Sequence, residues 1–527
     1  MTKLNFGAAD SYSISFLLFL VVGYFGAYKW SRIYLNEKLS SLVSIAWFSQ
    51  PIIWYHVKYT ALSLGIALLP TYTYIVYKFC NERELDLNRF ILKAFLLMTT
   101  FVFSVFMDGY TFVMLTVFSI FCWFFLSMLE TDKSINSPLA WFSILKLSLI
   151  LIFAGISALS YNSYFPGVID IYMPIDFYRG WGVDVKFLVT PTIGSNLIAD
   201  ITSLGVNRVP SMFFGDSSVY LSSYLLPLLS FSIFGFFKKS NNNLFKYLFF
   251  TVAIFSIYMA LGPSLKINAL RPDFHGSQLM PAEYGILSTG NSFIYQFIPG
   301  FKSMRATYRW TALFSFSLWF FYVQMLSTNY LKKRKGLSYI IILIVIVFSI
   351  PNISHRLSAQ TIYRNQIIEI ENVLSPKISE YVENNQVVMF MPVGNSLYAN
   401  FLASTGNYKT YNVGGDKNVK LAQANWPDKV GKIQEILYNS KKYDIVEISN
   451  ILGNDVIVIP NFSTNIAEQD ASKISICYIT FKSSNEYSEC ISNNKLIEKN
   501  KKIILNFYNS ELFELFENDM FTIIKNK

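Results

Sequence analysis

The chain has 527 residues, of which 53% are hydrophobic, 17% aromatic and 15% charged, and its mean hydropathy is +0.36. In soluble proteins about a quarter of the residues are charged, so this composition excludes soluble, collagen-like, disordered and disulfide-scaffold proteins. Apolar runs of about 18 to 22 residues, each long enough to cross a bilayer as a helix, recur from Tyr12 to about Pro351. The sequence therefore predicts a polytopic α-helical membrane protein.

The net charge of +10 is interpreted through membrane topology, because Lys and Arg gather in short cytoplasmic loops of such proteins. Nucleic acid is not an expected partner. Four cysteines are too few for a disulfide framework. Cys80 and Cys122 lie in or beside apolar runs and are expected to be packing residues, whereas a single disulfide between Cys477 and Cys490 stays open.

About ten membrane spans are expected. The second is interrupted by Gln50 and Pro51, although proline is tolerated in membrane helices when neighbours satisfy the freed backbone groups. The expected spans cover residues 13–28, 39–55, 59–77, 90–107, 110–129, 139–158, 219–237, 244–261, 309–326 and 337–350.

The basic clusters set the predicted orientation. Residues 332–335 (KKRK) follow the ninth span, and Lys238, Lys239 and Lys246 lie between the seventh and eighth, so both connections are expected in the cytoplasm. Threading the chain from them places the other short basic connections on the same side. Four parts of the chain are then expected outside the cytoplasm: the N-terminus, the Asp108-Gly109 turn, the large loops 160–218 and 262–308, and everything after Pro351.

The composition changes after residue 351. Residues 1–351 are predicted to form the transmembrane domain and residues 352–527 an extracytoplasmic α/β domain. In the second domain, residues 386–393 and 455–459 resemble buried strands, 474–481 an alternating strand and 428–438 an amphipathic helix.

No soluble-enzyme motif is present: the chain has no phosphate loop, HExxH, paired CxxC or GxSxG sequence, and its three histidines are dispersed. No metal or cofactor is therefore predicted. The most informative segment is 298–310, IPGFKSMRATYRW, where the four-residue spacing of Arg305 and Arg309 predicts one helical face, with Lys302 nearby. These cations fit a lipid phosphate, or alternatively headgroups and acidic loop residues.

Carboxylates that could act as a general base occur on the same predicted side. Asp108, in FMDGY, is either a functional residue at membrane depth or an ordinary turn residue. The loop aspartates could each deprotonate a sugar hydroxyl, and the pattern does not rank them; Asp184 is taken as a candidate. The loop set is Asp170, Asp176, Asp184, Asp200 and Asp216.

Several segments in this order resemble the bacterial GT-C superfamily of integral-membrane glycosyltransferases: GAYKWSRIYL, QPIIWYHVKYTALSLGIALLP, VDVKFLVTP, GDSSVYLSSYLLPLL, MALGPSL and IPGFKSMRATYRW. The similarity covers most of residues 6–351 and is loose in the tail. It implies a protein of the bacterial inner (plasma) membrane that transfers a sugar from a polyprenyl-phosphate donor to a glycan or lipid acceptor on the outer face. Arg305 and Arg309 would hold the phosphate, and an aspartate would be the base.

The chain departs from the family pattern at its start. The first predicted span runs from outside to inside and matches the family's second span, so the outer loop with the catalytic aspartate is missing and Asp10 is the acidic residue nearest its place. Three explanations stay open: a late reading frame, a partner that supplies the module, or a chain that is not catalytic. The alternative functions are an O-antigen polymerase and a non-enzymatic scaffold or lipid-binding component of a polysaccharide system.

Overall fold

The computed structural model describes residues 7–55, 61–82, 86–127, 138–164, 173–237, 243–272, 278–391, 397–411, 426–439 and 445–460, and most of 500–527. The chain divides into two compact units, which are described separately. The helical unit comprises residues 12–166 and 170–360, and the sheet unit comprises the rest. The predicted strand at 474–481 and the cysteines 477 and 490 lie outside the described residues.

Five helices are long and apolar enough to cross a membrane. Their outer surfaces are apolar as well: Leu17 and Phe25 of α1 and Phe95 of α5 are exposed, which suits lipid and not water as the surrounding medium. These five are consistent with a membrane protein and match five of the predicted spans. They are α1 (Ala8–Ser31), α5 (Leu87–Met107), α6 (Gly109–Ser127), α7 (Pro138–Tyr164) and α13 (Asn243–Leu261).

Two predicted spans are each broken into two helices, the first of them at the predicted interruption. Residues 39–55 form α2 (Glu37–Phe48) and α3 (Pro51–Trp54), because Gln50 before the proline is extended. Residues 219–237 form α11 (Ser217–Ser222) and α12 (Leu226–Phe237). The remaining predicted spans correspond to α4 (Ala61–Cys80), α15 (Thr311–Leu326) and α17 (Lys335–Ser349).

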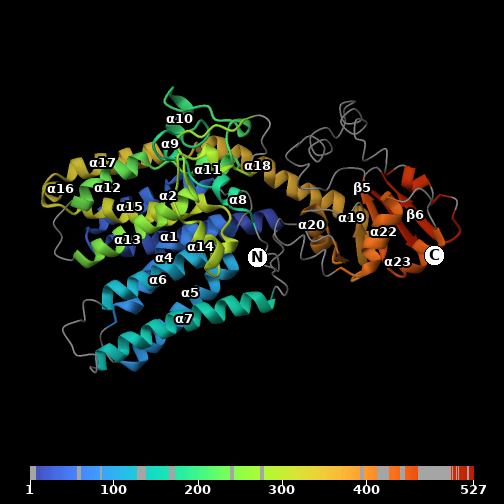
Figure 1. Ribbon diagram of the computed structural model, residues 1–527, viewed down its shortest axis with the longest axis horizontal. Coiled ribbons are helices and arrows are strands. Elements are labelled where there is room, and N and C mark those ends of the chain that lie inside the picture. Colours follow the sequence, from blue (N-terminus) through green and yellow to red (C-terminus); the bar gives the residue numbers. More distant parts are fainter. Residues whose placement is uncertain are drawn as a thin grey trace. The chain divides into compact units, whose positions relative to one another are not determined.

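Helix α15 is the centre of the helical unit. All of its residues are buried, as expected for a helix that is apolar on every side, and Figure 1 shows it between α12 and α13. The indole Nε1 of Trp319 donates to the carbonyl of Val43, at 2.9 Å, and so ties α15 to α2. Gly235 lets α12 approach closely, since a Cβ there would clash with the carbonyl of Phe321.

Short helices and turns order the two large loops. Several begin at an Asn or Asp N-cap whose side chain accepts a backbone N–H. These elements are α8 (Ile175–Gly180), α9 (Val185–Val189), α10 (Leu197–Ile201), η3 (Pro210–Met212), β1 (Ser264–Leu265), η4 (Ala282–Tyr284), β2 (Leu287–Ser288), α14 (Ser292–Phe297), η5 (Phe301–Ser303) and η6 (Thr307–Trp310), and α16 (Asn329–Lys333) and α18 (Ile353–Glu369) follow.

The sheet unit holds a five-stranded mixed sheet in the order β4-β3-β5-β7-β6. Strand β3 pairs in parallel with β4 and β5, and β7 pairs antiparallel with β5 and β6. The strands are β3 (Val387–Phe390), β4 (Lys409–Thr410), β5 (Val456–Pro460), β6 (Phe513–Glu517) and β7 (Phe521–Asn526); the helices are α19 (Ser375–Ser379), α20 (Leu397–Gly406), α22 (Asp428–Asn439) and α23 (Ile445–Leu452), with a π-helical turn at Ile370–Leu374.

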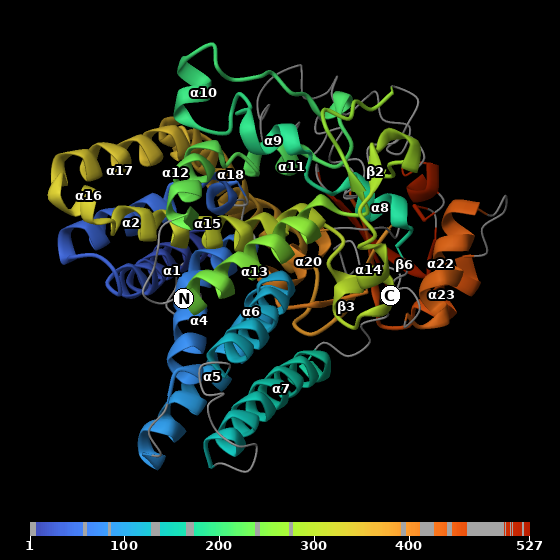
Figure 2. The same cartoon turned by 60° about the vertical axis from the view of Figure 1, so that its left-hand side comes forward.

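Both faces of this sheet are covered, which explains why β3 and β5 are apolar at successive positions. Val388 and Val458 pack with α19 and α20, whereas Met389 and Ile457 pack with α22 and α23; Figure 2 shows α22 and α23 beside each other. The buried strands at 386–393 and 455–459 and the helix at 428–438 are thus confirmed as elements, with shifted ends.

Candidate functional site

Two segments that are distant in sequence meet in the helical unit: the turn between α5 and α6, and residues 301–310. The hydroxyl of Tyr110 accepts the backbone N–H of Ala306, at 2.9 Å. The carboxylate of Asp108 accepts the N–H of Thr111, at 3.0 Å, and so begins α6. Asp108 is half-buried and its charge acts on the guanidinium of Arg309. The structure therefore brings together two of the predicted site residues, Asp108 and Arg309.

The predicted helical face for the two arginines is wrong. Residues 304–306 are not helical, and only Arg309 belongs to η6. Aromatic rings hold the guanidinium groups instead: Arg309 lies 4.4 Å from the ring centre of Tyr110, and Arg305 lies 5.8 Å from that of Phe177. Both charges nevertheless act on Tyr110, so the two cations stay in one site.

Lys302 lies beside this site through its backbone. Its carbonyl accepts the hydroxyl of Tyr178, at 2.6 Å, and its side chain is half-buried. That hydrogen bond joins α8 to η5, so Lys302 helps to fix the segment that carries Arg305 and Arg309.

Three stacked rings form a wall of the site. Phe177 and Trp181 stack at 5.7 Å between ring centres, and Trp181 and Tyr308 at 6.3 Å. Trp181 Nε1 and Arg309 Nε are buried, and neither has a hydrogen-bond partner among the described residues. A buried donor without an acceptor costs about 1–3 kcal/mol. Two such donors beside the rings are available to acceptor oxygens.

Asp216 extends the site from the other side. Its carboxylate accepts both the backbone N–H of Ser218, at 2.7 Å, and the Ser218 hydroxyl. Because that hydroxyl gives its proton to the carboxylate, the Tyr308 hydroxyl donates to Ser218, at 2.6 Å. Tyr308 is also within hydrogen-bonding reach of Arg309. A polar relay thus runs from exposed Asp216 to Arg309.

In the sequence, Asp216 is only one of five loop aspartates. The Asp-Ser-Ser pattern before an apolar run signals a helix N-cap, and Asp216 is indeed the N-cap of α11. Nothing in that local pattern shows that Ser218 would contact Tyr308, which lies 90 residues further along the chain.

Asp184 occupies a different environment. It is 2% exposed, and its two oxygens accept the N–H groups of Lys186 and Ala269, both at 2.9 Å. Its catalytic role stays a prediction, but these contacts are those of a residue that joins the two large loops.

The buried cation beside Asp184 is Lys266. Its Nζ donates to the carbonyls of Arg179, at 2.8 Å, and Gly182, at 2.5 Å. Burial lowers the pKa of Lys266 to about 7, against the opposing charge of Asp184. This amine is therefore close to losing its proton at neutral pH.

Asp10 forms a bidentate ion pair with Arg364 in the sheet unit, at 2.6 and 3.0 Å. A carboxylate gripped by a guanidinium on both oxygens is a weak proton acceptor. Its role as a base also stays a prediction.

An apolar groove of about 340 Å³ lies between α6 and α13. Its lining includes Phe121 and Phe255, and Phe255 contacts Trp310, the neighbour of Arg309, with 5.5 Å between ring centres. Phe121 is 12 residues beyond the start of α6, which corresponds to about 18 Å along the helix. The groove thus extends away from the cations along two candidate membrane spans.

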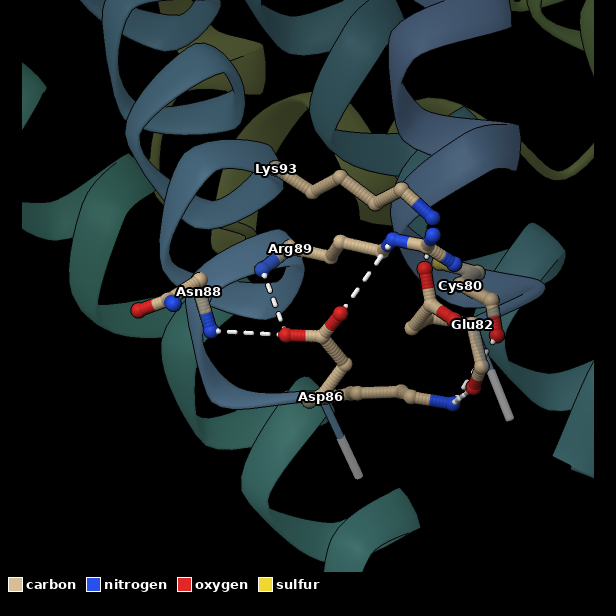
Figure 3. A network of polar contacts seen from close by, with 7 residues as sticks. Cys80, Glu82, Asp86, Asn88, Arg89 and Lys93 are labelled. Carbon is tan, nitrogen blue, oxygen red and sulfur yellow. Dashed lines mark hydrogen bonds and ion pairs between the residues drawn. The ribbon is translucent and has the colours of Figure 1, made fainter. Parts of the chain in front are cut away.

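A second polar network lies at the opposite end of α5, about 30 Å from Asp108 for a helix of this length. Figure 3 shows Asp86 at the start of α5, where it accepts the N–H groups of Asn88 and Arg89. Glu82 pairs with Lys93, and Lys146 of α7 donates to the carbonyls of Cys80 and Glu82. These contacts join α4, α5 and α7 and serve packing.

No protein-family model and no curated protein matches this chain. Within the described residues, no group of three or more His, Cys, Asp or Glu side chains could hold a metal ion. The candidate site is named the outer-loop site below, after the loops that the sequence predicts to lie outside the cytoplasm. It consists of Asp108, Tyr110, Phe177, Trp181, Asp216, Ser218, Arg305, Tyr308 and Arg309.

Proposed function

We propose that the protein is a membrane glycosyltransferase that moves a sugar from a polyprenyl-phosphate donor to a cell-envelope glycan or lipid. The observation that carries the proposal is the pairing of cations with unpartnered buried donors beside stacked aromatic rings. Arg305 and Arg309 supply charge for a phosphate, and Trp181 Nε1 and Arg309 Nε need acceptor oxygens.

The apolar groove supports a lipid-linked donor. Arg309 is followed by Trp310, whose ring contacts Phe255 in the lining of the α6–α13 groove. A prenyl chain attached to a phosphate at Arg309 would therefore be near that groove. An apolar chain in that groove gains about 0.8 kcal/mol per buried CH₂ group. A water-soluble nucleotide sugar would gain nothing from this groove.

The aspartates of the outer-loop site supply the base. Asp216 is exposed and is oriented by Ser218, so it is the preferred proton acceptor, with Asp108, whose charge acts on Arg309, as the alternative. The carboxylate removes the proton of an acceptor hydroxyl, and the hydroxyl oxygen attacks the anomeric carbon. The bond from that carbon to the phosphate oxygen breaks, and polyprenyl phosphate leaves with the electron pair, its charge stabilised by the arginines.

The topology proposed for this reaction places the outer-loop site and the sheet unit outside the cytoplasm of a bacterial cell. The basic residues 332–335 and the network at Glu82 and Lys93 would then lie on the cytoplasmic side, in agreement with the bias of Lys and Arg toward short cytoplasmic loops. Asp108 and Asp86, at the two ends of α5, would lie on opposite sides.

The test is transfer by the purified full-length protein in lipid nanodiscs, with a panel of synthetic polyprenyl-phosphate sugars and an acceptor glycan extract. Transfer that is lost in Arg309→Ala and Asp216→Asn supports the enzyme. Donor binding without transfer in any variant would instead favour a non-enzymatic lipid-binding role.

A further inference from the structure

The sheet unit contains a polar cavity that the proposed reaction does not use. It has a volume of about 650 Å³, within the range of sites for small molecules. It lies at the amino-terminal ends of β3 and β5, whereas ligands of parallel α/β sheets bind at the carboxyl ends. A nucleotide site of the usual α/β kind is therefore not its explanation.

Side-chain hydrogen bonds fix the rim of this cavity. The amide of Gln386 donates to the carbonyl of Asn454, at 2.9 Å, and joins the two turns that precede β3 and β5. The amide of Asn526, at the end of β7, donates to the carbonyls of Ser449 and Gly453, both at 2.9 Å. Three segments are thus held together without a ligand, which lowers the entropy cost of binding one.

The chemistry of the lining selects the class of ligand. Five carboxamide side chains line the cavity, at Asn384, Asn385, Gln386, Asn454 and Asn526. Each offers both a donor and an acceptor, which matches neighbouring hydroxyl groups. Asn384, Asn385 and Asn454 are exposed, and the buried Oδ1 of Asn526 has no partner among the described residues.

Other ligand classes fit less well. Glu383, Asp455 and Glu514 in the lining disfavour an anion, and Lys525 and Lys527 disfavour a simple cation. An apolar ligand would meet mostly polar groups and leave them without hydrogen bonds, which is costly. A neutral molecule with many hydroxyl groups remains.

We propose that this cavity binds a neutral saccharide, so that the sheet unit is a glycan-recognition module. The exposed carboxamides of Asn384 and Asn454 bind hydroxyl groups of the sugar, and the buried Asn526 Oδ1 accepts another hydroxyl. This inference rests on the sheet unit alone and does not require the proposed transfer reaction.

The experiment probes full-length protein in nanodiscs against a printed array of bacterial oligosaccharides and polysaccharides, followed by titration of the strongest neutral glycan. Asn384→Ala/Asn454→Ala removes two exposed carboxamides, and we expect affinity to fall about tenfold or more. Asn385→Gly removes a third carboxamide, and glycine suits the positive φ of 65° at that position. We expect the affinity to fall about threefold. Lys432→Ala/Glu435→Ala, on α22, is the control and should bind as the wild type does.

Two results would overturn the inference. One is an array on which no neutral glycan binds the wild-type protein. The other is a bound glycan whose affinity is the same in the wild type, both cavity variants and the control. This experiment measures glycan binding, so it can be interpreted even if the transfer assay fails. Active transfer together with a cavity that binds no glycan would refute only the recognition module.

Discussion

The Ser218 hydroxyl and the Tyr308 phenol oxygen lie 2.6 Å apart, and this contact joins the first turn of α11 to the segment that carries both arginines. It places Asp216 in the relay that ends at Arg309. The outer-loop site therefore depends on two stretches of chain that no local pattern connects.

The relay predicts the effect of Asp216→Asn. Asparagine keeps the N-cap of α11 but is not a base, so transfer should fall by about 10²-fold or more while the thermal unfolding midpoint stays unchanged. Asp86→Asn is the matched control. Asp86 is the N-cap of α5, as Asp216 is of α11, and it lies at the opposite end of α5 from Asp108. Equal activity of the two variants would remove Asp216 from the mechanism.

Arg309→Lys tests the phosphate grip. Lysine keeps the charge but loses the planar fork and the stacking on Tyr110, so polyprenyl phosphate should bind about tenfold more weakly, and Arg309→Ala weaker still. Arg334→Lys is the control, since Arg334 lies 4.7 Å from the ring centre of Tyr330 on the predicted cytoplasmic side. A similar loss in that control would show that the effect of replacing arginine by lysine is not specific to Arg309.

Lys266 predicts a pH dependence of stability. Its pKa is lowered from 10.5 to about 7 by burial, so between about pH 7 and 10.5 the unfolded chain holds a proton that the folded chain has released. Stability then rises with pH in that window, by up to about 1.4 kcal/mol per pH unit from this group. Below pH 7 both forms are protonated and its contribution is constant.

Lys266→Met should remove that part of the slope. The measurement is the thermal unfolding midpoint, followed by tryptophan fluorescence from pH 7 to 9.5, for the wild type and the variant in the same nanodiscs. If the unfolding midpoint changes with pH in parallel for the wild type and the variant, Lys266 keeps its ordinary proton affinity in the folded protein.

Lys146 predicts a purely structural effect. Lys146→Met leaves the carbonyls of Cys80 and Glu82 without their donor, and we expect a loss of about 2–3 kcal/mol in the free energy of unfolding. Lys78→Met on the exposed side of α4 should change it little. Donor binding by correctly folded Lys146→Met should equal that of the wild type.

Much of the fold was predictable from hydropathy because a lipid-facing helix must be apolar over its whole length. The positions of α1, α5, α6, α7 and α13 follow from that rule. The hydropathy rule fails where a helix is buried inside the protein and does not have to cross the bilayer as a single segment. The breaks at Gln50 and between Ser222 and Leu226 are of this kind.

The candidate site was predictable only in part. Residue type identified Arg305, Arg309 and Asp108, since cations and carboxylates are costly near a membrane and tend to be functional there. Their geometry was not predictable, because it depends on contacts such as Tyr110 with Ala306, which replace the expected helix around Arg305. The hydrogen bond from the backbone N–H of Ala269 to Asp184, 85 residues apart in the chain, was equally invisible in the sequence.

The most direct test of the account is binding of undecaprenyl phosphate to the full-length protein in nanodiscs, measured by native mass spectrometry with phosphatidylglycerol as competitor. The account predicts that the wild type retains undecaprenyl phosphate against excess phosphatidylglycerol and that Arg309→Ala loses it at least tenfold more readily. Equal retention by the two proteins, or displacement by phosphatidylglycerol at equal concentration, would contradict a polyprenyl-phosphate site at these arginines.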